Sequence, residues 1–551
     1  MIDDLWYKNA IIYSLNVGTF MDANGDGIGD FEGLSRCLDY LSGLGVTCIW
    51  LQPFQPSPYK DDGYDITDYY GVDRRHGSSG DFVDFAHQAT QRGIRIIIDL
   101  VVNHTSDQHP WFQSARKDRG SKYRNWYVWS KKRPRDYRQG MVFPGVQKAT
   151  WSFDKIAREW YYHRFYKFQP DLNTMNSEVR TEIQRVMGYW LELGVSGFRV
   201  DAVPFIIETQ EPGKKHIRQF EYLSAMRDFL QWREGDAILL GEANVVPDED
   251  LNYFGDEGER MHMMFNFFVN QHVFYALASG DAGPLAKAVR GTQSIPEYSQ
   301  WASFLRNHDE VDLGRLTSKQ RNLVYEKFGP EQRMQLYDRG IRRRLAPMLG
   351  GRPQLELAYS LMFSLPGTPV LRYGDELGMG DDLKLPERNS VRTPMQWSAE
   401  LHGGFSTADK TILPVIDDEV WGYRRINVAA QQRDPNSMLN WTERMIRLRK
   451  ECPEIGWGKY TVLNTGTPNV LAMRYDWRNN SLVTVHNFSE KPQKIRVRCG
   501  DVPGSDRLIN LIIGEHSRAD ADGKHTIVLE EYGYRWFRVG SLNYRLQREK
   551  Y

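Results

Sequence analysis

The segment GFRVDAV (197–203) decides the fold, because a short run of strand-forming residues ends there in a charged residue, Asp201. Two other segments have the same form: ILLGEAN (238–244) contains Glu242, and FLRNHDE (304–310) contains Asp309. Acids that follow apolar runs in this way are typical of sites at the C-terminal ends of parallel strands. The three carboxylates therefore predict one shared cleft. Three unrelated surface charges are the alternative.

Strand-like runs alternate with helical segments along most of the chain. In the helical segment 81–92, Phe82, Phe85, Ala86 and Ala89 recur at three- and four-residue spacing and so share one face. Eight strand–helix alternations predict an α/β fold, a (β/α)8 TIM barrel with its chemistry on the loops after the strands. The eight runs are residues 10–16, 46–52, 94–102, 197–203, 237–243, 263–269, 304–309 and 369–376.

Two regions interrupt this alternation. Residues 105–176 are rich in Trp, Tyr, Arg and Lys, lack a clear period and are too long for an ordinary loop, which predicts an inserted subdomain after strand 3. Beyond a last helix (440–451), short strand-like runs predict a C-terminal all-β sandwich domain; they are residues 470–477, 481–488, 494–499, 526–532 and 536–542. We expect a catalytic barrel of residues 1–104 and 177–452, an inserted subdomain B of residues 105–176, and a C-terminal domain of residues 453–551.

Composition narrows the class of protein. At 551 residues the chain is longer than a single core usually supports. It has 71 basic and 71 acidic residues, so no charge excess suggests a nucleic-acid or membrane partner. Aromatic residues make up 13%, a share that suits sugar-stacking platforms but also large cores. We expect a small-molecule substrate, and the sequence leaves open whether the chain forms a homo-oligomer.

The N-terminal segment and the cysteines indicate the cellular location that we expect for the protein. MIDDLWYKNAIIYSLN (1–16) begins with acidic residues and lacks the pattern of a secretory signal, and no apolar run is long enough to span a bilayer. The four cysteines have no CxxC spacing, which favours reduced thiols and a cytoplasmic protein; they are Cys37, Cys48, Cys452 and Cys499.

Three acids in one cleft suit chemistry on a glycosidic bond, where one attacks, one protonates the leaving oxygen and one steadies the transition state. Four short motifs in order strengthen this interpretation: DLVVNH (99–104), GFRVDAV, GEAN (241–244) and RNHDE (306–310). With them the chain resembles the α-amylase superfamily, glycoside hydrolase family 13, over nearly its whole length. The resemblance implies a retaining enzyme with Asp201 as nucleophile, Glu242 as general acid/base and Asp309 as transition-state stabiliser.

The same resemblance implies a set of sugar-binding residues. Arg199, two positions before the nucleophile, would keep Asp201 ionised. In DDGYD (61–65), Tyr64 resembles the residue that stacks on the first glucosyl unit and Asp61 the one that bonds its far hydroxyls, with Asp62 as a rival one position on. The remaining members of the set are His104, His308, Glu310 and Arg392, the last within ERNSVRTPMQW (387–397). For the two histidines the alternative is a structural role, and for Arg392 it is a surface charge.

The segment DANGDGIGD (22–30) has the pattern of a calcium loop. Its oxygens would come from Asp22, Asn24, Asp26, Asp30 and the carbonyl of Ile28. An EF-hand needs Glu at the twelfth position, which is Gly33, so this is a different loop type. A solvated acidic turn is the alternative. We expect a structural Ca²⁺ here and no organic cofactor.

The resemblance also implies a second calcium site between barrel and subdomain B. Its oxygens lie far apart in sequence and have no spacing signature, so the sequence leaves the site open. The matching positions are Asn103, Asp171, Glu208 and the carbonyls of Phe205 and Ile206.

Three stretches are similar to the trehalose synthase branch of the superfamily: residues 107–113, 341–349 and 369–397. This implies isomerisation of maltose to trehalose with side hydrolysis. An α-glucosidase acting on maltose- or sucrose-type sugars is the alternative, and an inactive barrel that only binds would require the loss of one carboxylate. Residues 13–20, a shortened 114–150 region and Arg372, where an aromatic residue is common, depart from the pattern and leave the acceptor open.

Overall fold

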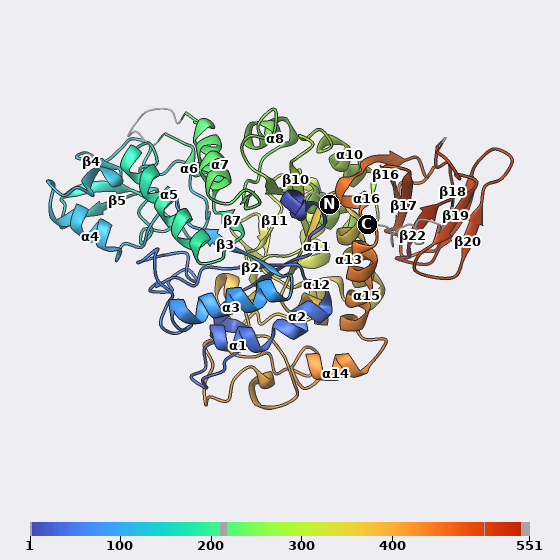
Figure 1. The fold of residues 1–551 in the computed structure, drawn as a ribbon, viewed down its shortest axis with the longest axis horizontal. Helices are drawn as coiled ribbons and strands as arrows, with labels where there is room; N and C mark the ends of the chain where they lie inside the picture. The colour runs from blue at the N-terminus through green and yellow to red at the C-terminus, as the bar shows by residue number, and fades with distance from the viewer. Residues whose placement is uncertain (1–2, 210–216, 501, 541–551) are drawn as a thin grey trace.

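Eight parallel strands form the centre of the molecule. The computed structural model describes residues 3–209, 217–500 and 502–540. In it the strands close into a barrel in the order β1-β14-β10-β9-β8-β7-β3-β2, which confirms the predicted fold class (Figure 1). They are β1 (Ile12–Leu15), β2 (Cys48–Leu51), β3 (Arg95–Leu100), β7 (Gly197–Val200), β8 (Ile238–Gly241), β9 (Met263–Phe265), β10 (Gln300–Phe304) and β14 (Thr368–Arg372).

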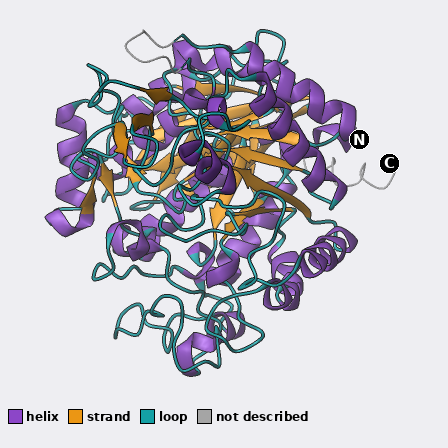
Figure 2. Cartoon of the chain, turned by 90° about the vertical axis from the view of Figure 1, so that its left-hand side faces the viewer, coloured by secondary structure: helices purple, strands orange, loops and turns teal. Residues whose placement is uncertain are grey.

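Helices surround these strands, as Figure 2 shows. In α3 (Ser79–Gln91) the four predicted residues are buried, and Ser78 and Asp81 form a capping box at its start. The other helices of the barrel are α1 (Phe31–Arg36), α2 (Leu38–Leu44), α5 (Ser177–Glu192), α6 (Val203–Ile206), α7 (Glu221–Arg233), α8 (Pro247–Phe254), α9 (Phe267–Ser279), α10 (Gly283–Gly291), α11 (Ser318–Phe328), α12 (Leu345–Leu349), α13 (Arg352–Ser364), α14 (Val428–Arg433) and α15 (Met438–Lys450).

Both faces of the barrel strands are buried, as expected of a parallel sheet inside a shell of helices. Trp50, Ile97, Leu240 and Phe265 fill the barrel interior in one apolar cluster. This layer closes the barrel below its C-terminal rim and forms a rigid base for the loops that follow the strands.

One predicted strand was too long and another was placed too late in the sequence. The run 263–269 ends as a strand at Phe265, because the Asn266 side chain accepts a hydrogen bond from the N–H of Val269 and starts α9. The run 304–309 is mostly loop: β10 precedes it and ends at Phe304. The side chain of Asn270 donates to the carbonyls of Phe304 and Leu305, at the point where the strand ends.

Subdomain B leaves the barrel after β3 and projects at the left of Figure 1. It contains α4 (Pro110–Lys117) and a small antiparallel sheet of β4 (Trp129–Ser130), β6 (Glu159–Tyr162) and β5 (Trp151–Asp154). Aromatic rings fill it; Phe112, for example, stacks on Trp129 with 5.6 Å between ring centroids. An isolated bridge between His104 and Asp171 ties its end to the barrel rim.

The C-terminal region is a two-layer β structure, at the right of Figure 1. One sheet has the order β15-β16-β17-β22-β19-β20 and the other pairs β18 with β21, and Val483, Ile495 and Phe537 pack between them. The strands are β15 (Lys459–Leu463), β16 (Val470–Trp477), β17 (Asn480–Asn487), β18 (Gln493–Val497), β19 (Arg507–Asn510), β20 (His516–Arg518), β21 (His525–Leu529) and β22 (Tyr534–Val539). Strands β15, β19 and β20 were not among the predicted runs, and the predicted residues 541–542 lie outside the described residues.

All four cysteines are buried free thiols. Within the described residues no helix combines the length and the apolar character that crossing a membrane requires.

Candidate active site

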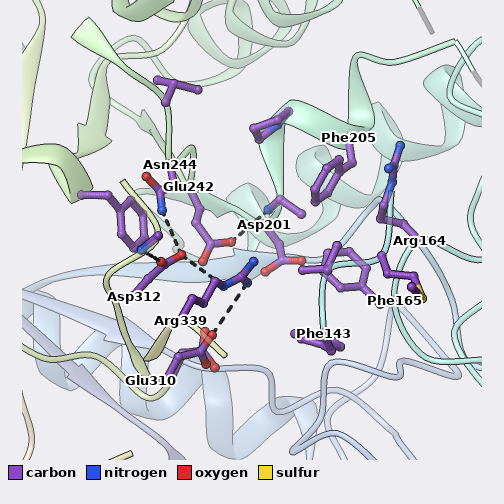
Figure 3. Close-up of a pocket in the computed structure, with 18 of the residues that line it drawn as sticks. Phe143, Arg164, Phe165, Asp201, Phe205, Glu242, Asn244, Glu310, Asp312 and Arg339 are labelled. Carbon is purple, nitrogen blue, oxygen red and sulfur yellow. Dashed lines mark hydrogen bonds and ion pairs between the residues drawn. The ribbon is translucent and has the colours of Figure 1, made fainter. Parts of the chain in front are cut away.

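Three acids meet at the C-terminal rim of the barrel. Asp201 follows β7, Glu242 follows β8 and Asp309 lies in the loop after β10. All three line one pocket of about 650 Å³, a size that suits a small-molecule ligand (Figure 3). Of the predicted sugar-binding residues, the same pocket is lined by Asp61, Tyr64, His104, His308 and Glu310.

Arg199 organises the floor of this pocket. Its Nη1 lies 2.6 Å from Asp201 and its Nη2 2.9 Å from Glu242, while Nη1 also pairs with Asp99. The arginine is 1% exposed, so these charge-assisted contacts are shielded from water. Asp99 stands in the quoted motif 99–104 but was not predicted as a site residue. It also accepts a hydrogen bond from the indole of Trp50 at 2.9 Å.

The two carboxyls differ in acidity. Burial raises the pKa of Glu242 to about 7, and the charges of Asp201 and Asp309 add to this while Arg199 opposes it. Burial likewise raises the pKa of Asp201 to about 6, again against Arg199. A raised pKa suits Glu242 to the role of proton donor near neutral pH, and the contact with Arg199 at 2.6 Å favours the ionised form of Asp201.

Asp309 is held as a carboxylate by two arginines. Arg388 Nη1 lies 3.0 Å and Arg392 Nη2 3.1 Å from its Oδ1. Burial alone would raise the pKa of Asp309, but Arg388, His308 and Arg392 together hold it well below its usual range. Arg388 also lies 3.0 Å from Glu310. Sequence reasoning chose Arg392 from this stretch and missed Arg388.

The structure separates the two arginines by position. Arg388 lines the pocket, whereas Arg392 is absent from the lining and is 5% exposed. Arg392 Nη1 lies 3.2 Å from Asp62, and its Nε donates to the carbonyl of His308 at 3.0 Å. Arg392 therefore contacts Asp309 and Asp62 in this geometry, and its contact with the sugar stays a prediction.

The glucosyl-binding residues form a connected wall. The hydroxyl of Tyr64 lies 2.8 Å from His308 Nε2, and the two rings stack with centroids 5.2 Å apart. His104 Nε2 contacts the carbonyl of Tyr64 at 2.9 Å. Asp61 lines the pocket and accepts a hydrogen bond from Gln169 at 2.8 Å, while its rival Asp62 is paired with Arg392. This arrangement favours Asp61 as the residue that contacts a sugar.

A second wall was not predicted. Figure 3 shows Asn244, Asp312, Arg339 and Glu310 in one polar chain on one side of the carboxylates and Phe143, Phe165 and Phe205 on the other. Asn244 donates to Asp312 at 2.9 Å, and Arg339 lies 3.6 Å from Asp312 and 3.8 Å from Glu310. These residues have no common motif, and Phe143 comes from the part of subdomain B without periodicity.

In the loop 22–30 the side chains of Asp22, Asn24, Asp26 and Asp30 accept hydrogen bonds from backbone N–H groups of the loop itself. Oxygen donors of this kind suit a hard cation. However, in the part of the chain that the structure describes, no three His, Cys, Asp or Glu side chains lie together as a metal site. The predicted set also uses the amide oxygen of Asn24 and the carbonyl of Ile28, and calcium binding by this loop stays a prediction.

The second predicted calcium set is partly assembled. Asn103 Oδ1 is buried without a hydrogen-bond partner among the described residues, and burial raises the pKa of Asp171 to about 7. Arg164 contacts both acids of this set. Its backbone N–H donates to Asp171 at 2.8 Å, and Nη2 of its positively charged guanidinium lies 2.5 Å from Glu208. The two carbonyl donors, Phe205 and Ile206, lie in α6.

A family model for the catalytic domain of α-amylase matches residues 15–333 and 342–458 of the chain. The chain belongs to the α-amylase family. A second model, for the C-terminal domain of sucrose hydrolase-like proteins, matches residues 480–538. The family resemblance predicted from the four motifs is therefore confirmed.

Relatives within the α-amylase family point to one branch of it. A trehalose synthase of Thermus thermophilus is 42% identical over 545 residues, 97% of this chain but only 56% of that protein, so the chain spans little more than half of this relative. The trehalose synthase/amylase TreS of Mycobacterium tuberculosis is 39% identical over 549 residues, 98% of this chain and 91% of that protein. These matches confirm the finer resemblance to trehalose synthases.

Solved structures of the α-amylase family agree with the fold. An α-amylase from H. orenii superposes with a TM-score of 0.77 at 27% identity, covering 97% of this chain and 99% of the other. A mutant of the trehalulose synthase MutB in complex with its substrate sucrose gives a TM-score of 0.78 at 26% identity, with 97% and 99% covered.

Proposed function

We propose that this protein is a retaining α-glucosyl-transferring enzyme that isomerises maltose to trehalose, with hydrolysis as a side reaction. The main observation is the shared guanidinium of Arg199, which holds Asp201 and Glu242 together in one pocket. Glu242 is also tied to the backbone N–H of Ala202, next to Asp201. A close pair of carboxyls is the arrangement of retaining enzymes, whereas inverting enzymes separate them to admit a water.

In the first half of the reaction, Asp201 attacks the anomeric carbon of the non-reducing glucosyl unit. Glu242 donates its proton to the glycosidic oxygen, so that the bond breaks and glucose is released into the acceptor side of the pocket. The negative charge of Asp309, secured by Arg388 and Arg392, steadies the oxocarbenium-like transition state. The product is a covalent glucosyl ester of Asp201.

In the second half, the freed glucose turns and presents its anomeric hydroxyl to the same carbon. Glu242, now ionised, removes the proton of that hydroxyl while the ester bond to Asp201 breaks. Two displacements on one carbon retain its configuration, so the new bond is α and the product is trehalose. Attack by water instead gives a second glucose and accounts for hydrolysis.

Retention of the freed glucose requires a covered pocket. Subdomain B is connected to two loops of the barrel by a cluster of hydroxyls around one carboxylate: Tyr166 lies 2.9 Å and Tyr337 3.1 Å from Glu387 Oε2. The guanidinium of Arg388 lies 4.8 Å from the ring centroid of Phe143 and extends the cover over the pocket. These contacts support isomerisation because they oppose both the escape of glucose and the entry of water.

An α-glucosidase is the second candidate, and one comparison favours it. An oligo-1,6-glucosidase of Parageobacillus thermoglucosidasius is 31% identical over 562 residues, 90% of this chain. The glucosyl side of the reaction would be the same, and only the acceptor would differ. A barrel that binds without catalysis is disfavoured, because the three carboxylates are all present and line one pocket.

Structural calcium belongs to the same proposal. The oxygens of residues 22–30 support a Ca²⁺ ion bound by Asp22, Asn24, Asp26, Asp30 and the Ile28 carbonyl, and the unpaired oxygen of Asn103 supports a second ion beside Asp171. When bound, the ions would brace loops at the rim of the barrel and take no part in the reaction. The buried free thiols support a cytoplasmic location.

Incubation with maltose plus labelled free glucose tests the function. An intramolecular isomerase forms trehalose with little label, since the leaving glucose never exchanges with solvent. Heavy labelling of trehalose would indicate an open transferase, and glucose as the sole product would establish the α-glucosidase.

A further inference from the structure

Three arginine side chains gather behind the active-site loops. Arg306 lies in the loop after β10, Arg344 precedes α12 and Arg372 ends β14. Their exposed fractions are 2%, 1% and 1%. A guanidinium removed from water to this degree costs free energy unless its charge and its N–H groups find partners.

The contacts that the three arginines make are mostly to backbone carbonyls. Arg306 Nη2 donates to the carbonyl of Asp309 at 2.6 Å, and Arg372 Nη1 to that of Asn307 at 2.7 Å. Arg344 Nη1 donates to the carbonyl of Tyr373 at 2.9 Å and lies 3.3 Å from Asp375. Among the described residues, this contact with Asp375 is the only ion pair that the three arginines make.

Five nitrogen atoms of the cluster have no acceptor. They are Arg306 Nε, Arg344 Nε and Nη2, and Arg372 Nε and Nη2, each buried and without a hydrogen-bond partner in residues 3–209, 217–500 and 502–540. Buried N–H groups are nearly always paired in folded proteins. The unpaired donors therefore require an acceptor that the described residues do not supply.

The three charges act on one another. Arg344 and Arg372 lie at similar distances from the ring centroid of Tyr373, 5.1 Å and 5.2 Å. Burial lowers the pKa of Arg372 to about 9 and that of Arg306 to about 10, and in each case the neighbouring arginines lower it further while Asp375 opposes them.

The acids near the cluster do not balance it. Asp375 is the one carboxylate that pairs with the cluster, against three guanidinium groups. Asp381 also acts on Arg344 but is paired with Arg343. Asp309 and Glu310 also act on Arg306, but both are already paired with Arg388, and Asp309 with Arg392 as well. Asp62, which Arg372 influences, is likewise paired with Arg392. The region behind the loop therefore has an excess of positive charge.

We infer that Arg306, Arg344 and Arg372 bind one small monovalent anion, of which chloride is the representative. An anion accepts several N–H groups at once and supplies the missing negative charge. The site is sealed, since the three side chains are at most 2% exposed, which favours a compact ion such as a halide or nitrate over a bulky organic acid. Arg372 is the residue that stands where the sequence pattern of the family commonly has an aromatic ring, so the anion accounts for that departure.

Such an anion would support the catalytic loop without touching the sugar. Two of the arginines hold the carbonyls of Asn307 and Asp309, so neutralising their charge should stiffen the loop that presents Asp309. The inference stands whether the enzyme isomerises or hydrolyses maltose, because it concerns only the scaffold behind the glucosyl site.

Thermal unfolding of the full-length protein in different sodium salts tests the site. The protein is freed of halide and titrated with chloride, bromide, nitrate or gluconate at a constant ionic strength. The three small anions should raise the melting temperature saturably, by about 1–3 °C over gluconate. Crystals soaked in bromide should show an anomalous peak within hydrogen-bond distance of the five nitrogens. Equal melting temperatures in all four salts, or water at these nitrogens in the bromide crystals, would overturn the inference.

A pair of variants completes the design. Arg372→Gln removes one charge and should abolish the difference between chloride and gluconate, whereas the matched control Arg36→Gln, on the exposed surface of α1, should keep it. If Arg372→Gln does not fold, the wild-type titration and the bromide peak decide the question alone. A folded Arg372→Gln protein that keeps the full response to chloride would place the anion elsewhere and refute the site.

Discussion

Glu242 accepts a hydrogen bond at 3.1 Å from the backbone N–H of Ala202, the residue that follows the proposed nucleophile. Ala202 makes this contact from a left-handed backbone conformation, with φ of 52°. A residue with a Cβ adopts this backbone conformation at a cost in free energy, and such strained residues are typical of functional sites. The position of the proton donor therefore depends on the backbone at one strained alanine.

Substitution of Ala202 tests this dependence. Ala202→Val should lower both the melting temperature and kcat, because a β-branched residue resists the left-handed region more strongly, by roughly 1–2 kcal/mol. The matched control Ala202→Gly removes the steric cost and should retain most of the activity. Equal kcat and equal melting temperatures for the Val and Gly variants would contradict the role given to this backbone.

Loss of the nucleophile should abolish the reaction. Asp201→Ala is expected to lower kcat on maltose by several orders of magnitude, because no other carboxylate can form the glucosyl ester. Circular dichroism should remain that of the wild type. Asp84→Ala, an exposed acid on α3, is the control and should be fully active. Near-normal turnover in a verified Asp201→Ala protein would refute the assignment.

The pH profile should be bell-shaped. Protonation of Asp201, whose pKa is raised to about 6, removes the nucleophile as the pH falls, and loss of the proton from Glu242, whose pKa is raised to about 7, removes the acid as the pH rises. The maximum of kcat/KM for maltose should thus lie between about pH 6 and 7.

A Glu242 variant tests whether this residue causes the loss of activity at high pH. Glu242→Gln should be nearly inactive on maltose, yet should still form the glucosyl enzyme from α-glucosyl fluoride, since fluoride departs without protonation. If the variant failed on both substrates while remaining folded, Glu242 would have a role other than proton donor.

Arg388 is expected to matter for both rate and product. Arg388→Lys keeps one charge but cannot bridge Asp309 and Glu310 with the geometry of a planar fork, so kcat should fall by about 10- to 100-fold. The pKa of Asp309 should rise, because Arg388 is the strongest of the groups that lower it. Glucose should increase relative to trehalose as the cover over the pocket loosens. Arg343→Lys, whose partner Asp381 is outside the pocket lining, is the control.

Calcium should stabilise the wild type. Chelation is expected to lower the melting temperature by removing a ligand that binds only the folded state. Asp26→Ala should lose that response while keeping its activity, as Asp26 is exposed and belongs to the loop 22–30. Absence of any binding heat when calcium is added to the metal-free wild type would exclude the ion from this loop.

Sequence information was sufficient where a motif and a strand end coincide. Asp201 and Glu242 follow β7 and β8 directly, so the strand pattern alone places them at the rim. It was insufficient where a loop decides the geometry. Arg388 and Arg392 are four residues apart in one stretch, and only the fold of that loop puts the first in the pocket wall and the second behind it.

Two further limits have physical causes. Strand β10 was placed too late in the prediction, because the polar residues after Phe304 were taken as the end of the strand. The strand ends at Phe304 itself, whose carbonyl accepts a hydrogen bond from the side chain of Asn270. The aromatic wall was missed because Phe143 and Phe165 lie in subdomain B, whose rings are distributed without a period that would reveal which of them face the sugar.

The contacts of Tyr166 and Tyr337 with Glu387 bear on the rate at which sugar leaves the pocket. We expect exchange of sugar with solvent to require these hydroxyl contacts to break, because they join subdomain B to the barrel loops. Glu387 makes them from a backbone with φ of 44°, where a non-glycine residue is strained. The leaving glucose has only the interval between two openings in which to turn and attack. The ratio of trehalose to glucose therefore reflects the rate of the second glucosyl transfer relative to the rate at which the pocket opens.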